Sequence, residues 1–137
     1  MPIKRPQHGV PHITFVMEQH LGHRTYAENI RTALRPRTDL TTTWIPITYE
    51  VSGAWWERIP FDGMRAAMRG RRQVLQAGSA LDADVIVFNT QVPAVLGGHR
   101  ARRRPFVLCM DDTPRLMDAM AAGYGYKVDR SGLVRWA

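Results

Sequence analysis

Cysteine and lysine are scarce in this chain. A single cysteine, Cys109, rules out a disulfide bond within the chain. Because Cys109 falls in an apolar segment, we expect it to be a small core residue rather than a reactive thiol. Only two of the 19 basic residues are lysines, so arginine carries nearly all of the positive charge.

Long apolar runs are also missing. No segment approaches the roughly 18 consecutive apolar residues that a membrane-spanning helix needs. The N-terminus is basic, but the apolar core of a secretory signal peptide does not follow it. We therefore expect a cytoplasmic protein that meets a membrane only peripherally, at its inner face.

The sequence lacks the common motifs for nucleotides and metals. The turn after the first predicted strand has one glycine, Gly22, where G-x-G-x-x-G needs three, and this disfavours NAD. A G-x-x-x-x-G-K-[ST] segment is absent, which excludes a P-loop nucleotide hydrolase. His20 and His23 have no carboxylate or cysteine at ligand spacing, so we expect no metal site.

The charge balance points to anionic surroundings. There are 19 Lys and Arg against 12 Asp and Glu, which gives a formal charge of +7. Arginine suits phosphate and carboxylate partners because its planar group donates hydrogen bonds in pairs. Either this charge attracts anionic ligands or an anionic membrane surface, or it is a solvated surface without a partner. The chain lacks an RNP pattern and a recognition helix, so we expect no nucleic-acid partner.

Residues 12–34 predict the opening of an α/β fold. The apolar run at 13–17 is too short for a helix and is typical of a buried parallel strand. A short polar turn follows, and apolar residues then recur at helical spacing until Pro36 ends the helix. A strand, a turn and a helix form the first half of a βαβ unit.

The rest of the chain continues this alternation. We predict strands at 41–49, 83–88 and 106–110, with Pro46 placing the first of these at a sheet edge or a bulge. Helices are predicted at 61–77, at 92–98 and from Pro114 to Met120. The predicted fold class is therefore α/β: a Rossmann-like, open and mainly parallel sheet with helices on both faces. One domain over 12–126 follows a lead-in at 1–11, and 127–137 is a tail or the start of a continuation.

The predicted helix at 61–77 has two sides of different character. Its helical spacing runs through Met64, Ala67, Met68, Val74 and Leu75. Arg65, Arg69, Arg71 and Arg72 crowd the other side. We favour a solvated face for them, with contact to lipid headgroups or nucleic-acid phosphates as the alternative. In the preceding loop, we expect Trp55 and Trp56 to pack on the core or in a lid rather than to bind a ligand.

Polar residues follow three of the predicted strands, at 18–23, 89–91 and 111–113. Because parallel strands end at one edge of a sheet, we expect these clusters to line a common crevice. The amides that follow Gly22 could hold a phosphate, and a histidine could serve there as a general base or hydrogen-bond donor. His20 and His23 could equally be exposed polar residues or helix caps. Asp111 and Asp112 could pair as acid and base, although we favour a helix cap for one of them.

Three segments together resemble a known family. EQHLGHRTYAENI at 18–30, ADVIVFNTQ at 83–91 and PFVLCMDDTPRLMDAMAAGYGY at 105–126 resemble, in order and spacing, the N-terminal domain of GT-B glycosyltransferases of the family 4 type. The most distinctive parts are the L-G-H-R-T-Y turn and the D-x-T-P-x-x-x-D stretch. The resemblance implies a retaining enzyme with two Rossmann-like domains, the first mainly for the acceptor and the second for a nucleotide-sugar. It implies no metal or other cofactor.

The resemblance also implies roles for individual residues. It places Gln19, Leu21 and Gly22 at the donor phosphates and sugar, with His20 and His23 as the catalytic candidates. The expected acceptor-side residues are Glu18, Asn89, Thr90, Gln91, Asp111, Asp112, Thr113 and Tyr124. The Asn-Thr-Gln cluster departs from the family, because many relatives present a histidine there.

The partners implied are a nucleotide-sugar and a sugar or lipid-linked acceptor. The sequence has no E-x7-E motif, the usual donor-site signature of the family. We therefore expect a donor-binding GT-B domain to act in cis or in trans, and this polypeptide alone to lack donor affinity and turnover. Many such enzymes work at membrane surfaces, which would give the arginines an anionic membrane as a partner.

A flavodoxin-like binding or regulatory domain without catalytic activity is the alternative. Such a domain needs an acidic cluster after the first strand and a lysine on a late strand. Glu18 supplies one acid, but the sequence has no lysine between Lys4 and Lys127. We therefore favour the glycosyltransferase half.

Overall fold

The computed structural model of the chain describes residues 9–20, 22–95, 103–110, 119–121, 123 and 125. Within these residues the chain forms an open sheet of four parallel strands in the order β2-β1-β3-β4. The strands are β1 (His12–Glu18), β2 (Thr41–Ile47), β3 (Val85–Phe88) and β4 (Phe106–Leu108). The predicted Rossmann-like, open parallel sheet is therefore confirmed, and Pro46 lies on the edge strand β2, as expected.

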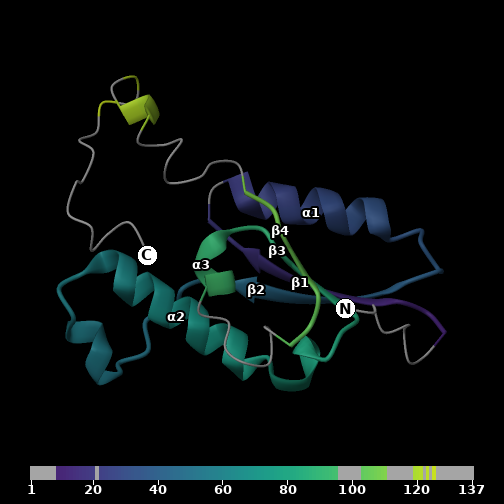
Figure 1. Cartoon of the computed structure of the whole chain (residues 1–137), viewed down its shortest axis with the longest axis horizontal. Coiled ribbons are helices and arrows are strands. Elements are labelled where there is room, and N and C mark those ends of the chain that lie inside the picture. Colours follow the sequence, from purple (N-terminus) through teal and green to yellow (C-terminus); the bar gives the residue numbers. More distant parts are fainter. Residues whose placement is uncertain are drawn as a thin grey trace.

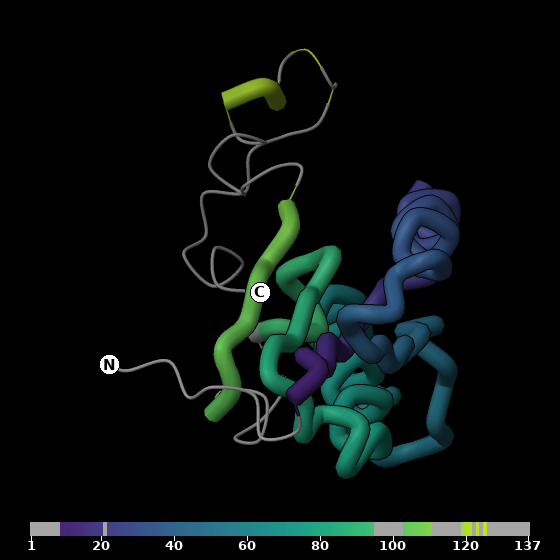
Figure 2. Tube along the Cα trace, turned by 90° about the vertical axis from the view of Figure 1, so that its right-hand side faces the viewer, coloured from purple at the N-terminus to yellow at the C-terminus, as the bar shows by residue number. Residues whose placement is uncertain are grey.

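Helices cover both faces of the sheet. Helix α1 (Gly22–Leu34) lies on one face, whereas α2 (Asp62–Gln76) and the short α3 (Gln91–Val95) lie on the other (Figure 1). Two 3-10 turns, η1 (Trp55–Arg58) and η2 (Gly78–Leu81), flank α2. The edge strand β4 runs along the opposite side of the molecule from α1 (Figure 2).

The alternation of side chains along β1 divides the core into two layers. Phe15 and Met17 pack against Ala27 of α1. Val16 points the other way, into the larger layer with Val74 of α2 and Ile86 of β3. Thr14, which points the same way and is buried, donates its hydroxyl hydrogen to the Ala80 carbonyl in η2. The central strand is therefore covered on both faces, which explains its continuous apolar sequence.

The structure corrects the predicted carboxyl ends of two strands. β2 ends at Ile47, so Tyr49 lies beyond the strand and adopts a left-handed backbone conformation with φ of 56°. β4 ends at Leu108, so Cys109 follows the strand and is half-buried rather than part of the core. The prediction that these two residues belong to strands was wrong, because residue types typical of strands continue in the sequence beyond the last residue that pairs with a neighbouring strand.

Helix α2 lies within one residue of its predicted start and end. Its apolar side was assigned only partly correctly: Val74 is fully buried, but Met64 and Leu75 are 49% and 47% exposed. Trp56 packs into the structure as expected, whereas Trp55 is 77% exposed. Among the described residues, no helix has the length and apolar character that crossing a bilayer requires.

Candidate functional site

The carboxyl ends of β1 and β3 meet at one edge of the sheet, through residues far apart in sequence. The Glu18 amide donates to Asn89 Oδ1 at 2.8 Å. The Gln19 amide donates to the Ile47 carbonyl at 3.0 Å, which adds the end of β2 to the same edge. Since β1 lies between β2 and β3, the chain reverses its direction of winding here. In open α/β sheets this switch point is where ligands bind.

Tyr49 joins this edge from the end of β2. A left-handed conformation is costly for a residue with a side chain, so the surrounding structure must hold it. Gln73 of α2 does so: its Oε1 accepts hydrogen bonds from the amides of Thr48 and Tyr49 at 3.1 and 3.0 Å. Its Nε2 donates to Thr48 Oγ1 at 2.7 Å. The tyrosine ring is thereby fixed against the core layer that also contains Val74.

Glu18, Tyr49 and Thr90 form a polar group at the end of that layer. Tyr49 packs against the core layer beneath α2, and both Glu18 and Thr90 are close enough to its hydroxyl to shift its pKa. The hydroxyl oxygens of Tyr49 and Thr90 are both buried, and neither makes a hydrogen bond of good geometry with a described residue. Buried hydroxyls without such a partner are uncommon in folded proteins.

The Tyr49 phenol stays neutral over the physiological range. Burial raises its pKa above the ordinary value, and the negative charge of Glu18 raises the pKa further. The neighbouring Thr90 hydroxyl acts in the opposite direction but does not offset these effects. Tyr49 is therefore suited to donating and accepting hydrogen bonds and unsuited to acting as a base.

The histidines lie on either side of the turn into α1. The His20 ring is exposed and stacks on Tyr49, with ring centres 5.4 Å apart. The His23 amide donates to the His20 carbonyl at 3.1 Å, where α1 begins. Within the described part of the chain, no group of three His, Cys, Asp or Glu side chains is arranged to hold a metal ion.

A hollow of about 630 Å³ opens at this edge on the α1 side. Its size is within the range of small-molecule sites. The start of α1, the end of β3 and the end of β4 line it through Gly22, His23, Tyr26, Asn89, Leu108, Cys109 and Met110. Asn89 also holds the Glu18 backbone, so it links this hollow to the polar group on the other face.

Gly22 lies in open space at the mouth of the hollow. A Cβ atom built at this position would meet no described atom within 4 Å beyond its chain neighbours. Packing around the turn therefore does not require glycine here. What the missing side chain provides is room beside the first amides of α1.

The structure places the other predicted site residues as follows. Gln19 folds back, and its Nε2 donates to the Met17 carbonyl at 3.0 Å, so its amide is engaged within its own segment. Gln91 is the first residue of α3. The remaining candidates lie outside the described residues: Leu21, Asp111, Asp112, Thr113 and Tyr124.

Sequence reasoning missed Tyr49, Tyr26 and Cys109 as site residues. For the other strands, the site candidates are the polar residues that follow the end of the strand. The same rule would have found Tyr49 if the second strand had been predicted to end at Ile47. Tyr26 and Cys109 carried no such signal, because each looked like part of an apolar face. No family model, curated protein or solved structure matches the chain.

Proposed function

We propose that this domain is the acceptor-binding half of a retaining glycosyltransferase and that it works with a donor-binding GT-B domain in cis or in trans. The observation that carries the proposal is the hollow of about 630 Å³ at the switch point of the sheet. It combines the predicted residues Gly22, His23 and Asn89 at the position where open α/β sheets bind small ligands.

The chemistry of the edge suits a neutral, hydroxyl-bearing ligand. The hollow is lined by the His23 imidazole, the Tyr26 phenol and the Asn89 amide, groups that can accept from and donate to the hydroxyl groups of a sugar. The carboxylate of Glu18 disfavours an anionic group on the α2 side of the edge, where it already raises the pKa of Tyr49. The exposed rings of His20 and Tyr26 offer apolar faces beside these polar groups.

In this proposal the donor approaches the start of α1. The first amides of the helix and its positive dipole end can receive a donor phosphate, and Gly22 leaves room for it. His23, which lines the hollow, faces the transferred group, while Glu18, Asn89 and Thr90 belong to the acceptor side. A nucleotide-sugar is the donor substrate, and no metal or cofactor is required by the proposal.

Amide chemical shifts during ligand titration test the assignment. Neutral glycosides and disaccharides should shift the amides of Gly22, His23 and Asn89, with dissociation constants in the millimolar range. His23→Ala should weaken this binding, whereas His12→Ala, at the amino edge of the same sheet, should leave it unchanged. The proposal fails if no sugar perturbs these amides. Tight nucleotide-sugar binding by this chain alone would contradict the assignment of donor affinity to a separate domain.

A flavodoxin-like binding or regulatory domain is the second candidate, and the strand order favours it. The order β2-β1-β3-β4 is the one with which flavodoxin-like sheets begin. Titration with flavin mononucleotide separates the two candidates. Stoichiometric binding that shifts the same amides, with no response to sugars, would select the flavodoxin-like function.

A further inference from the structure

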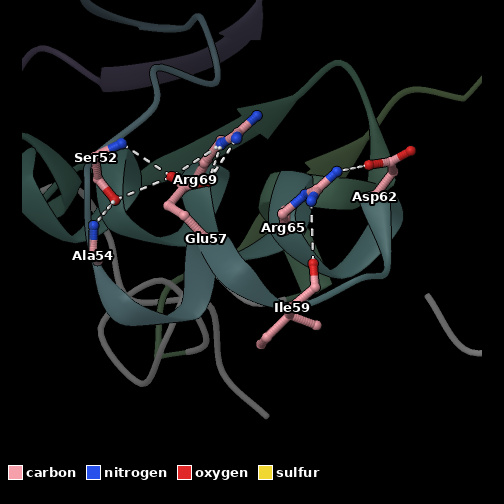
Figure 3. A network of polar contacts seen from close by, with 7 residues as sticks. All are labelled: Ser52, Ala54, Glu57, Ile59, Asp62, Arg65 and Arg69. Atoms are coloured by element: carbon pink, nitrogen blue, oxygen red, sulfur yellow. Dashed lines mark hydrogen bonds and ion pairs between the residues drawn. The ribbon is translucent and has the colours of Figure 1, made fainter.

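The arginines of the α2 segment fall into two groups of different function. Arg69 donates from Nε and Nη2 to the Glu57 carboxylate, with its shortest contact at 2.5 Å (Figure 3). Glu57 also accepts hydrogen bonds from the amide and hydroxyl of Ser52. Arg65 pairs with Asp62 and donates to the Ile59 carbonyl at 3.2 Å. These two arginines fasten the loop before α2 to the helix, so the expected solvated face is wrong for them.

The pairing leaves the other arginines of the segment in excess. Residues 51–77 contain five arginines but only two carboxylates, Glu57 and Asp62, and both carboxylates are paired. Arg58, Arg71 and Arg72 are exposed, and none of them has a carboxylate partner among the described residues. Three guanidinium groups therefore face solvent from one short stretch of chain.

Apolar side chains accompany these free cations. Met64, Met68, Arg71, Arg72 and Leu75 follow helical spacing along one side of α2, and the buried Gly70 and Val74 lie on an adjoining side. Arg71 and Arg72 line a hollow of about 370 Å³ together with Trp56, Met68, Leu75 and Gln76.

The segment leading into this face is unusually apolar for a surface. Trp55 and Phe61 are 77% and 64% exposed, and Val51 is 71% exposed. Single exposed apolar residues are ordinary, but several large ones in one segment, with free cations beside them, mark an interaction surface.

We infer that the outer face of α2, with the loop at 51–61, docks on a membrane that contains anionic phospholipids. Guanidinium groups beside an apolar hollow match a lipid phosphate and the adjoining acyl chains. Exposed tryptophan and phenylalanine are suited to the boundary between headgroups and hydrocarbon. Nucleic acid would use the arginines but not Met68 and Leu75. This inference goes beyond the proposed function and does not depend on it.

The size of the effect follows from the electrostatics of anionic surfaces. Each arginine near such a surface contributes about 1 kcal/mol, which is about fivefold in partitioning. Replacing both Arg71 and Arg72 by glutamine should therefore lower partitioning by a factor of about 30. Trp55→Ala should reduce it several-fold through lost apolar burial, with no change in its salt dependence.

Sedimentation of the full chain with vesicles tests the inference. Vesicles of phosphatidylcholine with about one-third phosphatidylglycerol should bind the chain, and pure phosphatidylcholine vesicles should bind it much less. Arg24→Gln/Arg35→Gln, on α1 and at the residue directly after it, is the matched control, because it removes the same net charge from the other face of the sheet. Circular dichroism confirms that each variant is folded.

Each other outcome overturns the inference. If Arg71→Gln/Arg72→Gln and the Arg24→Gln/Arg35→Gln control lost vesicle binding equally, the attraction would come from net charge alone. Equal binding to neutral and anionic vesicles, or no binding to either, would exclude an anionic lipid surface. A further outcome is that the chain binds a DNA duplex that displaces it fully from the vesicles. If that binding also required Arg71 and Arg72, this face would be assigned to nucleic acid.

Discussion

The contact between Gly70 and Tyr49 gives the most direct test of how the site edge is built. A Cβ atom at position 70 would lie 3.0 Å from Tyr49 Cε1 and 3.9 Å from the Pro93 Cα. Alanine inside a helix is favoured over glycine by about 1 kcal/mol. Extra volume in a packed site costs about 1–3 kcal/mol. Because Gln73 fixes the Tyr49 backbone, the ring has little freedom to retreat, and we expect Gly70→Ala to destabilise the protein by about 0–2 kcal/mol.

The sign of this effect should depend on Tyr49. In a Tyr49→Ala background the clash disappears, and Gly70→Ala should then stabilise the protein by about 1 kcal/mol. Urea denaturation of the two single variants and the double variant, followed by circular dichroism, gives the coupling free energy, which should be about 1–3 kcal/mol. If Gly70→Ala has the same effect with and without the tyrosine ring, the two residues are not coupled and the described packing is incorrect.

Three further predictions concern the same layers and the loop. Tyr49→Phe should raise the free energy of unfolding by about 1 kcal/mol, measured by urea denaturation, because it removes a buried hydroxyl that makes no hydrogen bond of good geometry with the described residues. Val74→Ala should lower the free energy of unfolding by about 2–3 kcal/mol, because Val74 is fully buried. Thermal unfolding measures this loss of stability. The hydrogen bonds from Arg69, then those from Ser52, lower the pKa of Glu57 from 4.5 to about 2. The free energy of unfolding should therefore fall as the pH drops from about 4.5 towards 2. In Glu57→Gln this fall should be less steep than in the parent protein. Asp39, whose pKa is also about 2, titrates in both proteins and accounts for part of the remaining fall.

The sheet could be predicted from the sequence because its signals are local. The apolar runs at 13–17 and 83–88 have a strand's length and are bounded by polar residues, and the turn between strand and helix follows directly. Parallel pairing then brings strand ends to one edge without further information. This is why Glu18 and Asn89, 71 residues apart, could be expected near each other before their hydrogen bond was seen.

Features that depend on tertiary pairing could not be predicted in this way. Arg69 looks like Arg71 and Arg72 in sequence, and only the position of the preceding loop brings it to a carboxylate, Glu57. Arg65 differs, because its partner Asp62 lies three residues earlier on the same helix. In sequence, Gly70 only interrupts a helical pattern, and nothing local shows that its missing side chain makes room for the Tyr49 ring. A left-handed tyrosine held by a glutamine 24 residues away has no local signature either.

Helix α2 connects the candidate site with the proposed membrane face. Gly70 and Gln73 contact Tyr49 and its backbone at the carboxyl edge, and Arg71 and Arg72 lie between them in sequence on the outer side of the same helical turn. A membrane bound at that side would therefore lie within one helix diameter of the edge. A lipid-linked acceptor could then keep its tail in the membrane while its sugar reached the edge. On this geometry, Arg71→Gln/Arg72→Gln should weaken binding of a lipid-linked acceptor in anionic vesicles but leave the millimolar binding of the free sugar unchanged. Equal weakening of both would show that the two arginines act on the site itself rather than through the membrane.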